Sequence, residues 1–185
     1  MRQRGEPEPR ENGRRPMGDE RAFTGMAEKI ASLEQAKVRV ASWRAGRKRI
    51  AYTNGCFDLL HAGHARTLET ARGLADALVV GMNSDHSTRR IKGPGRPIVP
   101  ERERAEMLAA LAAVDLVVVF PEDTSLAVIE ALRPEVWVKG GDYNAETVNQ
   151  EEKAFVESYG GEVALAGQVE GLSTSDLIAR IKQLG

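Results

Sequence analysis

The stretch Thr53–His64, TNGCFDLLHAGH, joins a short β-forming segment to an amphipathic one. Residues 49–53 are rich in β-forming side chains and end at the turn-forming pair Asn54-Gly55. Between His64 and Leu74, apolar residues recur at the spacing of one helix face. We therefore expect a strand, a loop and the start of a helix. In a βαβ unit this junction lies at the carboxyl end of the strand, where ligands bind and the first helical N–H groups lack internal partners.

Two histidines give this junction its chemistry. His61 and His64 are three residues apart, with Gly63 between them. If the helix begins near His61, both rings can reach one site, and Gly63 lets a ligand approach the backbone. Imidazole donates a hydrogen bond and, when protonated, carries a charge, which suits a polyphosphate. The spacing alone also leaves open a metal-binding pair or two polar surface residues, although no Cys or carboxylate stands nearby at ligand spacing.

The composition describes an ordinary globular protein. The chain has 185 residues, 42% of them hydrophobic and 29% charged, which is enough for one domain with a sizeable core. A formal net charge of −1 argues against a general binder of nucleic acid or of anionic membranes. The single Cys56 excludes an intramolecular disulfide framework. No apolar run is long enough for a bilayer span or a signal peptide, so we expect a cytoplasmic protein.

Residues 1–25 mix Arg, Glu, Pro and Gly and contain almost nothing to bury, so they are expected to form a disordered tail. Residues 26–185 are expected to form one domain that opens with a helix over 26–44. Short apolar runs at 77–82, 115–120 and 136–139 are typical of buried parallel strands. They alternate with helical patterns, the rhythm of a doubly wound sheet. We predict an α/β fold, a Rossmann-like doubly wound parallel sheet of about five strands, with later helices over 101–114, 125–132, 147–159 and 174–184 and a last strand over 162–165.

A long basic segment follows the second strand. Residues 83–100 are predicted to form a loop that holds Arg89, Arg90, Lys92 and Arg96 among Gly and Pro. Four cations beside a proposed phosphate site favour an anion-binding lid over a plain surface loop. In the helix that follows, Arg102 and Arg104 are expected to be surface charges and Met107 to face the core.

Four motifs together carry a family resemblance. Asn54-Gly55-Cys56-Phe57-Asp58 before His61-Ala62-Gly63-His64 resembles the first motif of the H-x-G-H nucleotidyltransferases. The other three are KGPGRP at 92–97, KGGDY at 139–143 and EGLSTSD at 170–176. With them, the chain from about Arg49 to its end is similar to the heptose 1-phosphate adenylyltransferases of ADP-heptose synthesis.

The resemblance implies a role for each motif. It makes His61, His64 and Lys92 catalytic and gives Asp58, Arg96 and Lys139 to the sugar phosphate or its loop. It assigns to the nucleotide Asn54, Gly55, Cys56, Phe57, Gly63, Gly141, Asp142, Ser173, Thr174 and Ser175. From the sequence alone, the glycine pair is equally a plain turn and Ser173-Thr174 a helix cap. The family has a Thr where this chain has Ser175, which preserves the hydroxyl.

The implied reaction transfers AMP from ATP to a heptose 1-phosphate and releases pyrophosphate. Mg²⁺ is expected to bind mainly through the ATP phosphates, so no protein metal ligand is assigned. The family implies a homodimer, and the short segment before the domain implies a separate upstream heptose kinase. Two alternatives stay open. One keeps the fold and the chemistry but changes the substrates, as in the cytidylyltransferases that act on glycerol 3-phosphate or a similar small phosphate such as phosphoethanolamine, and in the archaeal FAD synthases. The other is a non-catalytic nucleotide-binding module.

Overall fold

A computed structural model of the chain describes residues 25–141, 143–167 and 173–184. Nearly all of the expected N-terminal tail therefore lies outside the described residues. The elements are α1 (Met26–Lys29), β1 (Ile30–Ala31), α2 (Leu33–Ala45), β2 (Ile50–Gly55), α3 (Ala62–Gly73), β3 (Ala77–Asn83), α4 (Asp85–Lys92), α5 (Glu101–Ala110), β4 (Leu116–Phe120), α6 (Leu126–Leu132), β5 (Val136–Gly140), α7 (Gln150–Ser158), β6 (Glu162–Ala166) and α8 (Thr174–Lys182). None of the described helices is long and apolar enough to cross a membrane.

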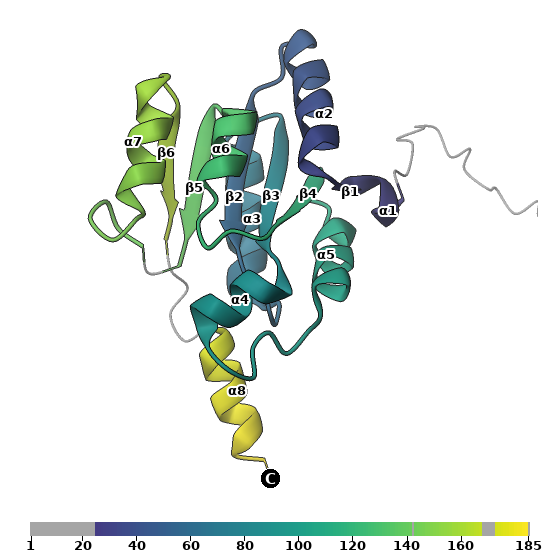
Figure 1. Cartoon of the computed structure of the whole chain (residues 1–185), viewed down its shortest axis with the longest axis vertical. Helices are drawn as coiled ribbons and strands as arrows, with labels where there is room; N and C mark the ends of the chain where they lie inside the picture. Colours follow the sequence, from purple (N-terminus) through teal and green to yellow (C-terminus); the bar gives the residue numbers. More distant parts are fainter. Residues whose placement is uncertain (1–24, 142, 168–172, 185) are drawn as a thin grey trace, which may run out of the picture.

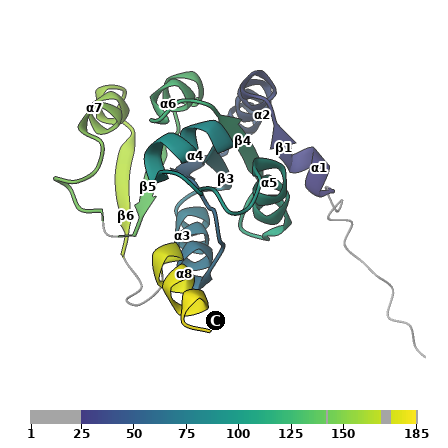
Figure 2. The ribbon, with the colours of Figure 1, turned by 60° about the horizontal axis from the view of Figure 1, so that its bottom comes forward.

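The strands form one parallel sheet in the order β1-β4-β3-β2-β5-β6. Helices α2, α6 and α7 cover one face, and α3 and α5 cover the other (Figures 1 and 2). Each face has its own apolar cluster. The strand order shows that the chain adds β3 and β4 on one side of β2 and then crosses over to add β5 and β6 on the other. The structure thus confirms the doubly wound parallel sheet.

The central strands are apolar because helices cover them on both sides. All seven residues of β3 are buried, as are the first four of β2. In such a strand every side chain lies in a core, which explains why the sequence shows unbroken apolar runs rather than alternation. Trp137 on β5 and Tyr52 on β2 are among the largest fully buried side chains.

The sheet has six strands rather than about five, because the first predicted helix is interrupted. Ser32 accepts a hydrogen bond from Gln35 N, and the side chain of Gln35 accepts one from Ser32 N. This capping box starts α2 at Leu33 and leaves Ile30–Ala31 outside it. The two residues instead pair with β4 and extend the sheet at that edge.

The loop predicted over residues 83–100 is wrong in its first half, where α4 forms. Ser84 caps this helix by accepting a hydrogen bond from Ser87 N, and Asp85 lies in its first turn. The basic residues Arg89, Arg90 and Lys92 fall in its last turn, where the helix dipole favours cations. Figures 1 and 2 show α4 beside the carboxyl end of the sheet. Most of the cations therefore sit on a short helix and not on a flexible loop.

Two expectations for the next helix are also wrong. Met107 is 55% exposed and does not face the core, and α5 ends at Ala110, so it is shorter than predicted. Arg104 is 1% exposed and is not a surface charge. The pattern placed the apolar stripe of this helix incorrectly because a buried arginine takes one of the positions on the core-facing side.

We predict that Gly81→Ala destabilises the fold. A Cβ at Gly81 on β3 would lie 2.0 Å from the Tyr52 hydroxyl oxygen and 2.7 Å from its ring carbon. Such overpacking typically costs about 1–3 kcal/mol of unfolding free energy. Tyr52→Phe in the Gly81→Ala background should recover part of that loss, because it removes the nearest atom. Urea unfolding followed by circular dichroism measures both changes.

Gly73→Ala is the matched control, since nothing lies within 4 Å of a Cβ at that position of α3. It should raise stability by about 0.4–1 kcal/mol by restricting the unfolded chain. Equal stability for Gly81→Ala and the wild type would contradict the proposed crowding.

Candidate active site

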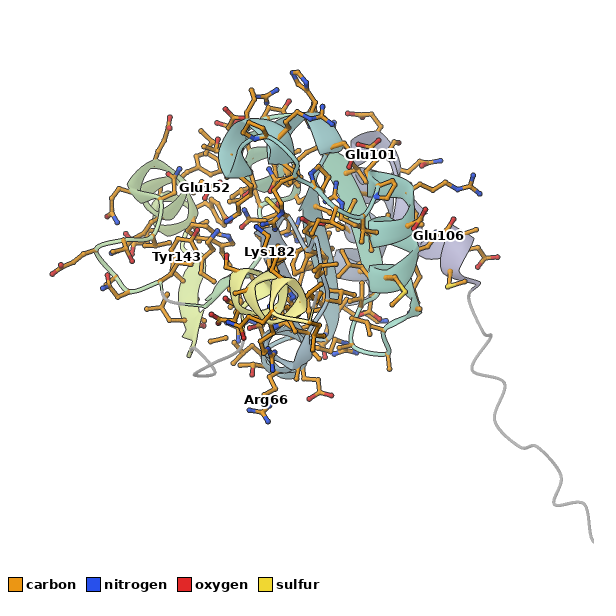
Figure 3. The ribbon with its side chains drawn as sticks, turned by 90° about the horizontal axis from the view of Figure 1, so that it is seen from below. Arg66, Glu101, Glu106, Tyr143, Glu152 and Lys182 are labelled. Atoms are coloured by element: carbon orange, nitrogen blue, oxygen red, sulfur yellow. The ribbon has the colours of Figure 1, made fainter. Side chains whose placement is uncertain are left out.

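A cleft of about 660 Å³ lies at the carboxyl end of the sheet. Figure 3 looks onto this end of the molecule, with α8 in front. Ser175 does not line the cleft, and Asp142 lies outside the described residues. The other predicted site residues all line it: Asn54, Gly55, Cys56, Phe57, Asp58, His61, Gly63, His64, Lys92, Arg96, Lys139, Gly141, Ser173 and Thr174.

The two histidines stack at the start of α3. His61 is the N-cap residue, and its Nδ1 accepts a hydrogen bond from Gly63 N at 3.1 Å. Its ring centroid lies 3.9 Å from that of His64, with the planes 30° apart. Because Nδ1 of His61 is an acceptor, the proton of the neutral ring is on Nε2. His61 can therefore donate a hydrogen bond without being charged.

The electrostatics of the pair favour neutral rings in the free protein. Burial, with a smaller contribution from His61, lowers the pKa of His64 to about 4. Burial also lowers the pKa of His61, and the carboxylate of Asp176 opposes that shift. The Nδ1 atom of His64 is buried and has no hydrogen-bond partner among the described residues. A buried polar atom left without a partner costs free energy and calls for an explanation such as ligand binding.

Asp58 ties the loop between β2 and α3 (residues 56–61), here called the motif loop, to the part of the basic segment that follows α4 (residues 93–100). Its carboxylate, 1% exposed, accepts hydrogen bonds from Arg96 Nε and from the backbone N–H groups of Ile98 and Val99. Burial acts to raise the pKa of Asp58, but these hydrogen bonds and the charge of Arg96 outweigh it and lower the pKa. Asp58 thus holds the loop that presents Arg96, and its own carboxylate is largely occupied.

Lys139 reaches the cleft from β5 as a buried cation. Its Nζ donates to Asn54 Oδ1 at 3.2 Å, and Trp137 Nε1 donates to the same oxygen. The ammonium lies 4.7 Å from the centroid of the Tyr143 ring. Burial lowers the pKa of Lys139, an effect that the negative charge of Glu152 opposes. A cation that has lost much of its hydration is well suited to pair with an incoming anion.

The two glycines after Lys139 have different functions. A Cβ on Gly140 would lie 2.3 Å from Thr67 of α3, so this glycine allows strand and helix to pack closely. Gly141 has φ +92 and open space around it, so it allows the chain to turn. Both glycines line the cleft, and Gly141 is the one at which the backbone turns.

The hydroxyl motif occupies the N-terminus of α8. Ser173 Oγ accepts a hydrogen bond from Asp176 N and donates to its carboxylate, so the capping role is present. Thr174 Oγ1 donates to Leu59 O at 3.4 Å, which joins α8 to the motif loop. Both hydroxyls nonetheless line the cleft.

The cations predicted as anion ligands divide into two groups. Lys92, at the end of α4, and Arg96 line the cleft. Arg90 instead donates to Asp123 and to Pro121 O, which fastens α4 to the segment before α6. Arg89 is exposed and is not among the residues of the cleft.

Sequence reasoning missed the structural role of Arg104. Its guanidinium donates to Cys56 O on the motif loop, to Asn83 O at the end of β3 and to Val99 O on the basic segment. It also pairs with Asp85 of α4 at 2.7 Å. One buried side chain therefore joins four segments around the cleft. Only its position beside the basic segment pointed to it.

The wall formed by α6 and α7 was also missed. Thr124, Asn149 and Glu152 line the cleft there, and Glu152 is 2% exposed. In sequence, Glu152 is one of two acidic residues in the first turn of α7, a common place for a solvated carboxylate. No local signal distinguishes it from Glu151.

Comparison with known proteins identifies the family. A family model described as Cytidylyltransferase-like matches residues 52–180, from the end of the first predicted strand into α8. The chain belongs to the cytidylyltransferase-like family. This family membership confirms the predicted resemblance to the nucleotidyltransferases and covers all four motifs.

Curated members of the family include proteins named Bifunctional protein HldE. The one from Syntrophotalea carbinolica is 58% identical over 134 residues, covering 72% of this chain and 27% of that protein. The one from Nitrobacter hamburgensis is 52% identical over 160 residues, covering 86% and 32%. The chain thus spans about a third or less of the length of the curated relatives it matches.

Two solved structures share the fold of this family member. A lipopolysaccharide core biosynthesis protein from Thermoplasma volcanium superposes with a TM-score of 0.54 at 25% identity, covering 66% of this chain and 97% of that one. A pantoate-beta-alanine ligase from Francisella tularensis gives 0.56 at 14% identity, covering 83% and 76%. The second supports the fold alone.

We predict that the free protein loses stability in acid partly through His64. The unfolded ring titrates near ~6.5, whereas the folded ring titrates at about 4. Between these values the unfolded state binds a proton that the folded state does not, so the unfolding free energy falls as the pH falls. The contribution is complete above the unfolded value and is lost as the pH falls to the folded one. Urea unfolding at several pH values from 7 to 4.5 measures this slope.

His64→Gln should show a shallower loss of stability over the same range, because the substituted side chain does not titrate. His86→Gln is the control, since His86 is exposed on α4 and away from the cleft. A slope in His64→Gln equal to that of the wild type would rule out this source of acid sensitivity.

We predict that Arg104→Lys lowers the unfolding free energy by at least about 2 kcal/mol. Lysine keeps the charge but cannot reach all of the backbone oxygens that the guanidinium serves, and each buried acceptor left without a donor costs about 1–3 kcal/mol. Arg102→Lys is the control, because that side chain is 89% exposed. Matching urea midpoints for the two variants would show that the buried network is dispensable.

Proposed function

We propose that this chain is a heptose 1-phosphate adenylyltransferase, transferring AMP from ATP to give ADP-heptose and pyrophosphate. The observation that carries the proposal is the pair of stacked imidazoles at the N-terminus of α3, in a cleft that also holds Lys92, Arg96 and Lys139. This set of hydrogen-bond donors suits a polyphosphate. The resemblance of the KGGDY motif to the heptose enzymes supports the choice of substrates. The identity to the proteins named Bifunctional protein HldE supports the same proposal.

In the proposed reaction, a phosphate oxygen of the sugar 1-phosphate attacks the α-phosphorus of ATP. A bond forms between that oxygen and the phosphorus, the bond to the β-phosphate oxygen breaks, and pyrophosphate leaves. A phosphate monoester has a second pKa near ~6, so at neutral pH the nucleophile needs no general base. The protein must instead align two anions and stabilise the charge that develops on the leaving group.

The histidines would act as hydrogen-bond donors to the α-phosphate. His61 is set for this by its Nδ1 contact with Gly63 N, which leaves the Nε2 proton available. An anion bound beside the rings would raise their pKa values from the depressed values of the free protein, adding positive charge where the transition state needs it. Lys92, Ser173 and Thr174 would hold the β- and γ-phosphates, and Arg96 would orient the acceptor phosphate.

Mg²⁺ would enter with the nucleotide as part of the substrate. The residues around the cleft offer mainly imidazoles, cations, amides and hydroxyls, which bind phosphate oxygens rather than a hard cation. The carboxylate of Asp58 is occupied by Arg96 and two backbone N–H groups. The ion would neutralise phosphate charge while the side chains position the phosphates.

A sugar kinase would supply the acceptor in the cytoplasm, and the family suggests a homodimer.

We predict that His64→Ala lowers kcat by about 10²–10³, the usual cost of removing a donor that acts mainly in the transition state. Pyrophosphate release with Mg²⁺, ATP and a heptose 1-phosphate measures the effect. Far-UV circular dichroism verifies that the variant is folded, and His86→Ala should behave as the wild type. An unchanged kcat in a folded His64→Ala variant would refute the assigned role.

The substrates are tested by comparing ATP and CTP against heptose 1-phosphates of both anomers, hexose 1-phosphates, glycerol 3-phosphate and phosphoethanolamine. We expect pyrophosphate only from ATP with a heptose 1-phosphate. Release only with CTP would keep the fold and the roles of the motifs but transfer the protein to the cytidylyltransferases. Nucleotide binding without release from any pair would favour a binding module.

A further inference from the structure

One wall of the cleft carries none of the four motifs. It is built from the segment before α6 and from the start of α7, and Thr124, Asn149 and Glu152 line it. Helices α6 and α7 lie on one face of the sheet, whereas α3, which carries the histidines, and α8, which carries the hydroxyls, lie on the other (Figure 2). The cleft is therefore bounded by nucleotide motifs on one side and by an unassigned polar wall on the other.

Glu152 is the buried charged residue of that wall, whereas Asp123, which also lines the cleft before α6, pairs with Arg90. Asn149 caps α7 by accepting a hydrogen bond from Glu152 N. The side chain reaches toward α6, where Oε1 accepts hydrogen bonds from Ser125 N and from Ser125 Oγ at 2.8 Å. Because Ser125 is fully buried, this carboxylate has a fixed orientation. Figure 3 places Glu152 on the α7 side of the cleft, toward Tyr143.

The second oxygen of this carboxylate, Oε2, is accessible from the cleft. Glu152 is 2% exposed, yet Oε2 makes no hydrogen bond with any residue that the structure describes. Lys139 is near enough to be affected by the charge of Glu152, but its Nζ donates to Asn54. Oε2 is not among the buried atoms that lack a partner, so it is open to the cleft and can accept a hydrogen bond from a molecule bound there.

The in-line geometry of the proposed displacement indicates which substrate supplies the hydrogen-bond donor to Glu152. In an in-line displacement the nucleophile approaches the α-phosphorus opposite the leaving group. If α8 and Lys92 hold the leaving phosphates, the acceptor approaches from another part of the cleft, and Thr124, Asn149 and Glu152 of the α6/α7 wall belong to none of the four motifs. A carboxylate repels the acceptor's phosphate and accepts hydrogen bonds from its hydroxyl groups.

We propose that Glu152 Oε2 accepts a hydrogen bond from a hydroxyl group of the acceptor sugar and selects a polyhydroxylated sugar phosphate over smaller phosphates. This inference rests on the proposed function and extends it from the phosphate-binding motifs to the sugar. Ser125 is the positioning residue, because its two hydrogen bonds to Oε1 direct Oε2 away from α6.

The test uses Glu152→Gln in the full chain. The amide oxygen of glutamine can still accept from Ser125, so α6 keeps its contact, but Oε2 is replaced by a group that cannot accept. Loss of a hydrogen bond to a charged group should lower kcat/KM for heptose 1-phosphate about 10–100-fold. We expect this through KM for the sugar, with KM for ATP unchanged. Glu151→Gln, an exposed neighbour on the same helix, should match the wild type.

Monodeoxy analogues of heptose 1-phosphate separate sugar recognition from a structural role. The analogue that lacks the hydroxyl bound by Glu152 should be a poor substrate for the wild type, with the same loss in kcat/KM that Glu152→Gln shows with heptose 1-phosphate. The Glu152→Gln variant should use this analogue and heptose 1-phosphate equally well. Calorimetric binding of the same compounds, with α,β-methylene ATP present, gives the comparison without turnover. A general loss for ATP and all acceptors, or a loss confined to phosphoethanolamine, would overturn the inference.

Failure of the proposed function would be seen in the wild type, whereas failure of this inference would be seen in the Glu152→Gln variant. If the wild type neither binds nor uses any sugar 1-phosphate, the proposed function falls, and the inference falls with it. If the wild type uses heptose 1-phosphate and Glu152→Gln does so equally well, only the role of Glu152 is refuted.

Discussion

The buried guanidinium of Arg104 holds together the segments from which the cleft is made. The ends of parallel strands and the loops that follow leave backbone carbonyls without partners, and each of these needs a donor when it is buried. Arginine offers five N–H groups in a rigid fork, so one side chain can serve the carbonyls of Cys56, Asn83 and Val99. Asp85 balances its charge. The motif loop, the end of β3, α4 and the basic segment are in this way fixed relative to one another.

Much of the fold could be predicted because it depends on local patterns. Unbroken apolar runs mark strands covered on both faces. The Asn54-Gly55 pair marks the first strand-to-helix junction, although β2 extends through both residues rather than turning at them. The capping box at Ser32 and the cap at Ser84 are also local signals, and they account for the strand β1 and the helix α4 that the apolar patterns do not predict.

The buried charges could not have been predicted in the same way. Arg104 and Glu152 look like ordinary helical surface charges, because nothing within a few residues explains their burial. Their partners lie far along the chain: Arg104 reaches Cys56, and Glu152 reaches Ser125. Such residues become recognisable only when the fold brings donors and acceptors together. The motif residues could be predicted because the sequence resembles the H-x-G-H nucleotidyltransferases, and their roles stay predictions.

The contact between Gly140 and Thr67 constrains how this cleft can diversify. Strand β5 and helix α3 touch at a point where not even a methyl group fits, so the histidines and the turn at Gly141 keep a nearly constant separation. In the proposed function, that separation would set the room for the nucleotide. New acceptor preferences would then arise more readily on the α6/α7 side, where side chains can change without prising the strand from the helix. Substitutions near the contact between β5 and α3 would therefore be more constrained than substitutions in the α6/α7 wall.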